Sequence, residues 1–203
     1  MISVIIITFN QEEFLRRHLS NWLEQDLLQS EVIVVDMNSE DNTILLLEQQ
    51  EEIYNNLRHV SLPASARGIS KDRLAIMLGM RMADNDRVII TTPRCYPTDN
   101  TWMAQVNATW NTQRPILLIP VWPDLRKPTC KQRWNRFLAR HGHPRLLGPA
   151  LGYNRQLFLQ QNGFPSRLKP KQSALDTLVR TYAKKQNTQV CNLIMPYNGL
   201  KVK

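Results

Sequence analysis

The sequence is poor in cysteine and in long apolar runs. Its three cysteines, Cys95, Cys130 and Cys191, lie far apart and form neither a CxxC pair nor a Cys/His cluster. A structural zinc site is therefore not indicated, and we interpret the cysteines as free thiols in a reducing compartment. No apolar run approaches the roughly 18 residues that a membrane-spanning helix needs.

A leader segment is not indicated either. The apolar stretch SVIII near the N-terminus is too short for the core of a signal peptide, and neither a preceding basic segment nor a following cleavage site is present. We expect a cytoplasmic protein or a domain cut from a longer chain. The 203 residues are 42% hydrophobic and 21% charged, which is ordinary for one soluble domain with a substantial core.

Acidic residues are missing from one long stretch. The formal net charge is +9, and no Asp or Glu occurs from Leu125 to Leu175. The basic residues of this stretch are Arg126, Lys127, Lys131, Arg133, Arg136, Arg140, Arg145, Arg155, Arg167, Lys169 and Lys171. Such asymmetry indicates an anionic partner: a nucleotide, a phosphorylated lipid, a membrane surface or nucleic acid. A solvated basic surface is the alternative.

Patterns typical of buried strands alternate with helical patterns in the first half. We expect strands at residues 3–8, 31–36, 57–62 and 87–91, and helices after Asn10 and at residues 43–54 and 70–83. Asn10 is the expected cap of the first helix, with Glu13 completing a capping-box pattern. This alternation predicts a single α/β domain with a mostly parallel sheet flanked by helices.

Ligands of such sheets bind beyond the C-terminal ends of the strands. This rule selects three segments of the chain: Thr8 to Asn10, Asp36 to Asp41, and Thr91 to Tyr96.

The second half of the chain is less regular. We expect a strand at 115–120, a basic amphipathic helix at 130–142, a short helix and turn within 148–165, a helix at 174–182 and a strand at 188–194. On the basic helix, Trp134, Phe137 and Leu138 fall on one side. That pattern suits docking on an anionic membrane surface, and packing into the core explains the aromatic residues at least as well.

Several segments, in this order, resemble the family 2 glycosyltransferases, whose nucleotide-sugar-binding domain has the Rossmann-related GT-A fold. SVIIITFNQEEFLRRHLSNWLEQ is similar to the family's first strand, turn and helix, and EVIVVDMNSEDNT to its V-V-D-x-x-S-x-D-x-T segment. GYNRQLFLQQNGFP is similar to a later R-x-x-F helix and G-G-F turn. Residues 65–102 further resemble a Bacteroidetes branch. Residues 1–100 would then be the nucleotide-binding half and 101–203 the acceptor-side half.

The resemblance implies a nucleotide-binding role for Asp36, which ends a strand at the ligand edge. Its carboxylate suits the N–H of a uracil-like base or a ribose hydroxyl, whereas a turn-stabilising role is the alternative. Thr8, Phe9 and Asn10 would line the same pocket, and Arg67 could reach a phosphate. Ser39 and Asp41 are expected to shape the loop and cap the following helix.

Most members of the family hold Mg²⁺ or Mn²⁺ with an aspartate-x-aspartate motif after the fourth strand. In this sequence the two positions fall at Thr92 and Arg94, so no metal ligand is assigned. One interpretation is that Arg94 replaces the metal by binding the diphosphate itself. The other is that the metal site is lost and the protein binds its ligand without catalysing a reaction. Asp99 is expected to cap the helix that contains Trp102.

The resemblance also implies an aspartate near the start of a late helix as the catalytic base, and Asp176 is the acidic residue left there. It could equally be a solvated helix residue. His141 and His143 are alternatives with a suitable unperturbed pKa, or surface residues.

The leading hypothesis is therefore an inverting transfer of a sugar from a nucleotide diphosphate sugar to a glycan or lipid-linked acceptor. The alternative is an inactive binding or scaffold protein with the same fold. We expect a cytoplasmic protein that binds peripherally at the inner face of a membrane, and no nucleic-acid partner, because no nucleic-acid motif or stacking platform accompanies the basic residues.

Overall fold

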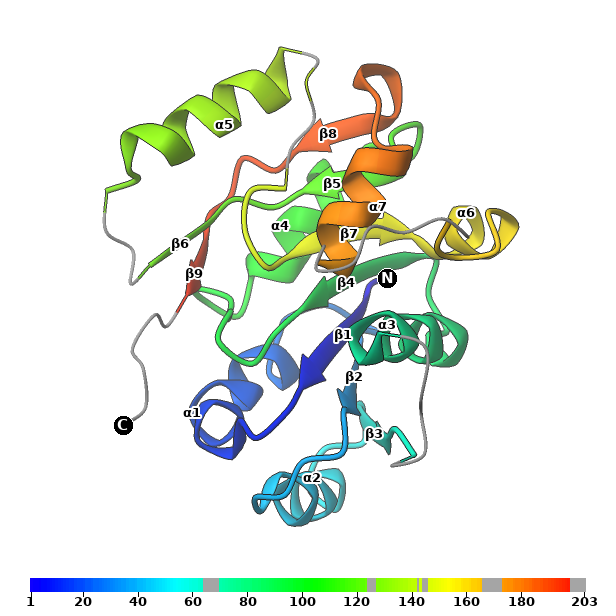
Figure 1. Cartoon of the computed structure of the whole chain (residues 1–203). Helices are drawn as coiled ribbons and strands as arrows, with labels where there is room; N and C mark the ends of the chain where they lie inside the picture. Colours follow the sequence, from blue (N-terminus) through cyan, green and yellow to red (C-terminus); the bar gives the residue numbers. More distant parts are fainter. Residues whose placement is uncertain (64–69, 124–126, 142, 144–145, 166–172, 198–203) are drawn as a thin grey trace.

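The computed structural model describes the chain except for residues 64–69, 124–126, 142, 144–145, 166–172 and 198–203. In the described part, a seven-stranded sheet carries helices on both faces (Figure 1). Its strands are β1 (Ser3–Thr8), β2 (Glu31–Asp36), β3 (Leu57–Ser61), β4 (Arg87–Thr91), β5 (Ile116–Leu118), β7 (Leu151–Asn154) and β8 (Thr188–Val190). The helices are α1 (Glu12–Leu23), α2 (Thr43–Glu51), α3 (Lys71–Met82), α4 (Trp102–Thr109), α5 (Cys130–Arg140), α6 (Arg155–Gln160) and α7 (Ala174–Tyr182), with a 3-10 turn η1 (Lys185–Asn187).

The strand order is β3-β2-β1-β4-β7-β5-β8. β1 is parallel to β2 and β4, β2 to β3, and β5 to β8, whereas β7 is antiparallel to both of its neighbours. The predicted α/β domain with a mostly parallel sheet is confirmed. Both predicted halves contribute to this one sheet, and the C-terminal ends of β1, β2 and β4 lie at one edge, where ligands bind in such folds.

Alternation along the strands divides the core into two layers. Val4 and Ile6 of β1 pack with residues of α1, α2 and α4 on one face of the sheet. Ile5 packs with residues of α3 and α7 on the other face. Helix α3 approaches the sheet closely at Gly79, where a Cβ atom would lie 2.6 Å from Cγ2 of Ile5.

Prolines shorten the strand that the sequence predicts over 115–120. β5 ends at Leu118, and the chain then forms β6 (Val121–Pro123), which pairs in parallel with β9 (Met195–Tyr197) in a separate two-stranded sheet. Since proline has no N–H for a ladder, Pro115 and Pro120 fit at the limits of β5. The second sheet was not predicted, because three-residue strands containing proline show no clear alternation.

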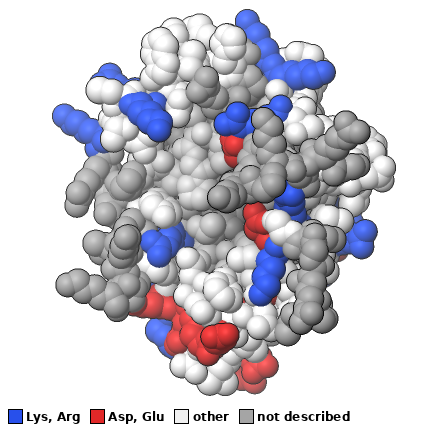
Figure 2. All heavy atoms as spheres, in the orientation of Figure 1, with Lys and Arg blue, Asp and Glu red and all other residues white. Residues whose placement is uncertain are grey.

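Charged side chains are unevenly distributed over the surface. In Figure 2, most of the visible acidic side chains lie at the lower end, where Figure 1 shows α2, while Lys and Arg are spread over the whole face. The segment around α2 supplies Glu40, Asp41, Glu48, Glu51 and Glu52. No helix among the described residues is long and apolar enough to cross a membrane.

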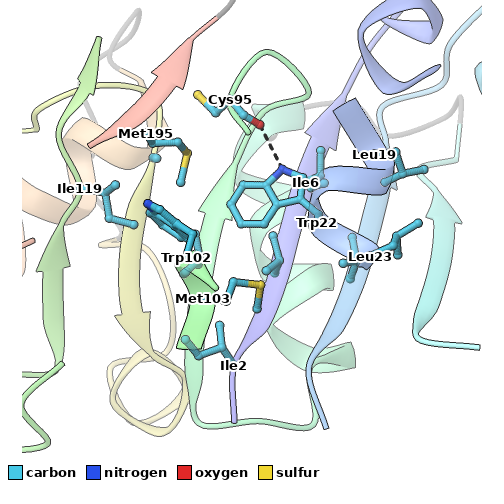
Figure 3. Close-up of a cluster of buried hydrophobic side chains, with 14 of the residues drawn as sticks. Ile2, Ile6, Leu19, Trp22, Leu23, Cys95, Trp102, Met103, Ile119 and Met195 are labelled. Atoms are coloured by element: carbon cyan, nitrogen blue, oxygen red, sulfur yellow. Dashed lines mark hydrogen bonds between the residues drawn. The ribbon is translucent and has the colours of Figure 1, made fainter. Parts of the chain in front are cut away.

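A buried tryptophan ties helix α1 to the loop that follows β4. Trp22 is 1% exposed, and its Nε1–H donates a hydrogen bond of 3.0 Å to the carbonyl oxygen of Cys95 (Figure 3). The ring also packs edge-on against Trp102 of α4, with 5.9 Å between ring centroids. Because Cys95 lies four residues after the end of β4, this contact fixes the course of the loop at the ligand edge.

We expect Trp22→Phe to lower the free energy of unfolding by about 1–3 kcal/mol, because it removes a buried donor and leaves the smaller ring underpacked. Urea denaturation followed by circular dichroism measures the change. Trp134→Phe, at an exposed position, is the matched control and should leave stability unchanged. A loss below about 0.5 kcal/mol for Trp22→Phe would contradict the proposed anchoring role.

Candidate functional site

The loops after β1 and β2 are joined by reciprocal hydrogen bonds at the ligand edge. The backbone N–H of Asn10 donates to Oγ of Ser39 at 2.9 Å, and the N–H of Glu40 donates to Oδ1 of Asn10 at 2.8 Å. Asn10 adopts a left-handed backbone with φ of 50°, which asparagine tolerates better than most residues. Asn10 therefore ties two loops together at the edge of the sheet.

Asn10 is not the cap of α1, and the predicted capping box is wrong. The helix begins at Glu12, and no side chain of its N-cap residue, Gln11, makes a capping bond. Asp41 supplies the carboxylate instead, accepting from the N–H of Glu12 at 3.1 Å and from that of Thr43, at the start of α2, at 3.1 Å. Although burial acts in the opposite direction, hydrogen bonds from Thr43 and Glu12 hold the pKa of Asp41 below its usual range. The expected loop-shaping role of Asp41 is confirmed.

Asp36 is fully buried at the end of β2. One carboxylate oxygen accepts from the N–H of Ser39 at 2.9 Å, and the other accepts from the Ser39 hydroxyl. The turn-stabilising role that the sequence left open for Asp36 is therefore present, and Ser39 shapes the loop as expected. A contact between Asp36 and a nucleotide stays a prediction.

A cavity of about 290 Å³ opens beyond the C-terminal ends of β1 and β4. Its described lining residues are Ile7, Phe9, Gln11, Met37, Asp72, Ile76, Thr91, Thr92, Pro149, Ser173, Ala174 and Leu175. Two of the residues predicted from the sequence, Phe9 and Thr92, are among them. The cavity lies on the α3 and α7 side of the sheet.

Thr8, Asn10 and Asp36 are not among the described residues that line this cavity, whereas Phe9 is. The expectation that Thr8, Phe9 and Asn10 line one nucleotide pocket stays a prediction. Thr8 pairs with Asp36 in the parallel register and is fully buried. By strand alternation both side chains belong to the face covered by α1 and α2, whereas Ile7 belongs to the opposite face. The strict period of the strand was the signal that could have separated them.

Asp72, in the first turn of α3, is a cavity-lining carboxylate that the sequence analysis missed. Oδ2 accepts from the N–H of Ala174 at 3.1 Å, and Oδ1 accepts from the Ser70 hydroxyl and from the N–H of Arg73. Asp72 thus joins α3 to the first turn of α7, although 102 residues separate it from Ala174. No local spacing signals a contact of that length.

The mouth of the cavity combines an exposed ring with a cation. Phe9 is 44% exposed, and Nζ of Lys71 lies 5.8 Å from the centroid of its ring. The same ammonium group donates to the carbonyl oxygen of Met37 at 3.4 Å. An apolar ring beside a flexible cation can accept a planar base and an anionic group together.

The loop after β4 places Thr92 and Arg94 where the resemblance implies metal ligands. Thr92 accepts the backbone N–H of Cys95 at 3.0 Å, which closes a tight turn. The guanidinium carbon of Arg94 lies 4.4 Å from the centroid of the Phe14 ring, and Arg94 does not line the cavity. A hydroxyl and a guanidinium do not fit a divalent cation. Across the described residues, no group of three His, Cys, Asp or Glu side chains could hold a metal ion.

The remaining predicted residues lie apart from the cavity or outside the described residues. Asp176, in the first turn of α7, is ion-paired with Arg180, with 2.5 Å between Oδ2 and Nε, and is not a lining residue. His141 and His143 are exposed at the end of α5. Arg67 lies outside the described residues. Asp99 accepts from the N–H of Thr101 at 3.0 Å, but Thr101 is the N-cap of α4 and the helix has no side-chain cap bond, so Asp99 shapes the turn before the helix and the expected cap is wrong.

Comparison with known proteins now identifies the family. The sequence model described as Glycosyl transferase family 2 matches residues 3–146, which is most of the chain. The chain belongs to glycosyl transferase family 2.

A curated relative from Methanococcus voltae is named dolichyl N-acetyl-alpha-D-glucosaminyl phosphate 3-beta-D-2,3-diacetamido-2,3-dideoxy-beta-D-glucuronosyltransferase. It is 29% identical over 98 residues, a match that covers 47% of this chain and 30% of the relative. The alignment therefore spans less than a third of that protein.

Solved structures show the same fold. TarS from S. aureus, in complex with UDP-GlcNAc, has a TM-score of 0.71 at 19% identity, covering 100% of this chain and 59% of that one. The mannosyltransferase PcManGT from Pyrobaculum calidifontis, in complex with GDP-Man and Mn²⁺, has a TM-score of 0.74 at 19% identity, covering 98% and 57%. The predicted GT-A fold is confirmed, and the chain spans under two thirds of these two neighbours.

A histidine on α1, His18, packs against the loop after β4, and its titration tests how closely the helix and the loop are packed. The ring of His18 stacks on that of Tyr96, with 4.1 Å between centroids and 3° between planes. Burial, together with the nearby charge of Arg17, lowers the pKa of His18 below its ordinary value of 6.5.

Because the folded state resists protonation of His18, stability should be full above pH 6.5 and fall as the pH drops below it. We expect the midpoint temperature of the wild type to fall more between pH 7.5 and 5 than that of His18→Phe, which keeps a stacked ring. His143→Gln, at an exposed position, is the control. Equal pH dependence in the wild type and His18→Phe would show that this histidine does not titrate against the fold.

Proposed function

We propose that the chain is a glycosyltransferase domain that transfers a sugar, with inversion, from a nucleotide diphosphate sugar to a glycan or lipid-linked acceptor. The observation that carries the proposal is the cavity beyond β1 and β4, at the edge where ligands bind in such sheets. Two structural neighbours, TarS and PcManGT, were solved with nucleotide sugars, which supports this class of donor.

The residues around the cavity suit the parts of such a donor. The exposed ring of Phe9 offers an apolar face for the base, and Lys71 beside it offers a charge for phosphate. Thr8, Asn10 and Asp36 support this wall, and Asp36 remains our candidate for a contact with the base or ribose. Arg67 remains a candidate phosphate ligand. The cavity of about 290 Å³ is at the small end of ligand pockets, so the donor would extend past Phe9.

The residues at the usual metal position do not fit a divalent cation, so we propose that Arg94 neutralises the leaving diphosphate. A guanidinium binds phosphate oxygens through its N–H edge while its planar face stacks on an aromatic ring. The guanidinium carbon of Arg94 lies 4.4 Å from the centroid of the Phe14 ring, and Arg94 is two residues from Thr92, which lines the cavity. A fixed positive charge then stabilises the negative charge that develops as the sugar leaves.

Two carboxylates are candidates for the base that takes the acceptor's proton. Asp176 is the residue to which the family resemblance points, and its carboxylate is paired with Arg180. The oxygens of Asp72 are engaged as well, since they accept from Ala174, Ser70 and Arg73. The two differ in that Asp176 does not line the cavity. Asp72 is the carboxylate that lines the cavity, and it contacts the first turn of the same helix. Because a base acts on a proton within hydrogen-bond reach, we assign the role to Asp72.

A scaffold protein without activity is the second candidate function. It is favoured by Thr92 and Arg94 in place of acids and by the ion pair of Asp176.

The basic second half of the chain fits an acceptor held at an anionic membrane surface, consistent with a peripheral, cytoplasmic location.

The first test is calorimetric titration with UDP and GDP in the presence of EDTA and of Mn²⁺. We expect binding without metal and a loss of about tenfold or more for Arg94→Ala, because a charge-assisted hydrogen bond is removed. Arg81→Ala, an exposed position at the end of α3, is the matched control. Binding that appears only with Mn²⁺ would contradict metal replacement, and no binding would remove the donor site.

The second test measures turnover of nucleotide sugars by Asp72→Asn and Asp176→Asn. Loss of a general base costs about 10²–10⁴-fold, so Asp72→Asn should fall by at least about a hundredfold and Asp176→Asn by less than tenfold. Thermal melts check that α7 stays docked in both variants. The reverse order would assign the base to Asp176, and nucleotide binding without any turnover would favour the scaffold function.

A further inference from the structure

Helix α5 presents its aromatic side chains to solvent. Trp134 and Phe137 are 60% and 48% exposed, and their rings stack with 5.5 Å between centroids. Phe137 also stacks on the ring of His141, with 4.1 Å between centroids. Packing into the core, which the sequence left open as an explanation for these aromatic residues, is therefore wrong.

The opposite side of α5 holds the helix to the rest of the molecule. The guanidinium of Arg136 lies 5.6 Å from the centroid of the Trp122 ring in β6 and donates to the carbonyl oxygen of Asn192 at 3.4 Å. Ala139 is buried in the core. A capping box between Thr129 and Gln132 begins the helix. These contacts fix which side faces outward, so the exposed aromatic side is a defined surface and not a disordered end.

The outward face has helical spacing and a consistent charge. Residues at positions i, i+3, i+4, i+7, i+10 and i+11 are all exposed, and we name this set the α5 face: Cys130, Arg133, Trp134, Phe137, Arg140 and His141. Lys127 and Lys131 are exposed beside it. No acidic residue occurs in the sequence from 125 to 175. Stacked and exposed aromatic rings between cations mark an interaction surface.

We propose that the α5 face docks on the surface of an anionic phospholipid bilayer. A tryptophan ring is favoured at the boundary between headgroups and acyl chains, and lysine and arginine beside it bind anionic headgroups. Helix α5 has 11 residues, so it lies in the plane of the surface and does not span it. This inference goes beyond the proposed sugar transfer and does not depend on it.

Two other occupants fit the α5 face less well. A second copy of the chain would bring the same cations against Arg133 and Arg140, and like charges repel. Proteins that bind single-stranded nucleic acid stack its bases on separate aromatic side chains. Here the rings of Trp134, Phe137 and His141 stack on one another, which occupies the faces that a base would use.

Co-sedimentation of the full chain with vesicles tests the proposal. We expect binding to phosphatidylcholine vesicles that contain phosphatidylglycerol, weaker binding as salt is raised, and at least about tenfold less binding to phosphatidylcholine alone. Lys131→Glu/Arg133→Glu and Trp134→Ala/Phe137→Ala should each lower binding to the anionic vesicles by about tenfold or more. The matched controls are Arg81→Glu/Arg114→Glu and Leu45→Ala/Ile53→Ala, at exposed positions elsewhere.

Tryptophan fluorescence gives a second readout, which does not depend on enzyme activity. Of the five tryptophans, Trp22, Trp102 and Trp110 are buried and Trp122 is half-buried. Trp134 is therefore the tryptophan with a largely exposed ring. Anionic vesicles should shift the emission of the wild type to shorter wavelength, and Trp134→Phe should abolish the shift.

Three results would overturn the proposal. The first is equal vesicle binding by the wild type and the α5 face variants. The second is a preference for single-stranded RNA over vesicles. The third is a dimer in analytical sedimentation of the wild type that is absent in the Trp134→Ala/Phe137→Ala variant. Calorimetric titration of the same preparations with UDP separates this outcome from a failure of the donor site, because the α5 face variants should bind UDP as the wild type does.

Discussion

The ligand edge of this protein depends on a hydrogen-bonded link between the loops after β1 and β2. Asn10 exchanges hydrogen bonds with Ser39 and Glu40, while the buried carboxylate of Asp36 and the exposed carboxylate of Asp41 fix the same turns. Neither loop could keep its course alone, because each supplies acceptors for the backbone N–H groups of the other. The loop after β4 is held separately, by Trp22 of α1. Together these contacts place Phe9 and Thr92 on the wall of one cavity.

The distribution of charge gives the fold its second constraint. Acids gather near α2, and the stretch from 125 to 175 has none (Figure 2). Arg94, which we propose takes the place of a metal ion, would add positive charge next to the cavity wall at Thr92. A donor with a diphosphate and a surface with anionic headgroups would then meet positive charge at different places, the cavity mouth and the α5 face.

Local patterns predicted most of the elements and the ligand edge, because buried parallel strands produce continuous apolar runs that tertiary context does not override. The strand period could also have shown that Thr8 and Ile7 belong to opposite faces of the sheet. What the sequence could not supply were contacts between distant segments: Asp72 on Ala174, and Asp41 in place of Asn10 at the start of α1. The sequence left open whether the aromatic side of α5 is buried or exposed, for a related reason. An amphipathic pattern says which residues share a side, and only packing decides which side is buried.

We propose above that this edge of the sheet binds a nucleotide diphosphate without a divalent metal. Hydrogen–deuterium exchange of the full chain with saturating UDP or GDP in EDTA tests it most directly. The account predicts slower exchange at residues 7–11, 91–96 and 173–175, which form the wall of the cavity and the adjoining β4 loop. Protection at residues 84–87 and 154–156 on the opposite edge, with unchanged exchange at the cavity wall, would contradict it. So would protection of the cavity wall that appears only after Mn²⁺ is added.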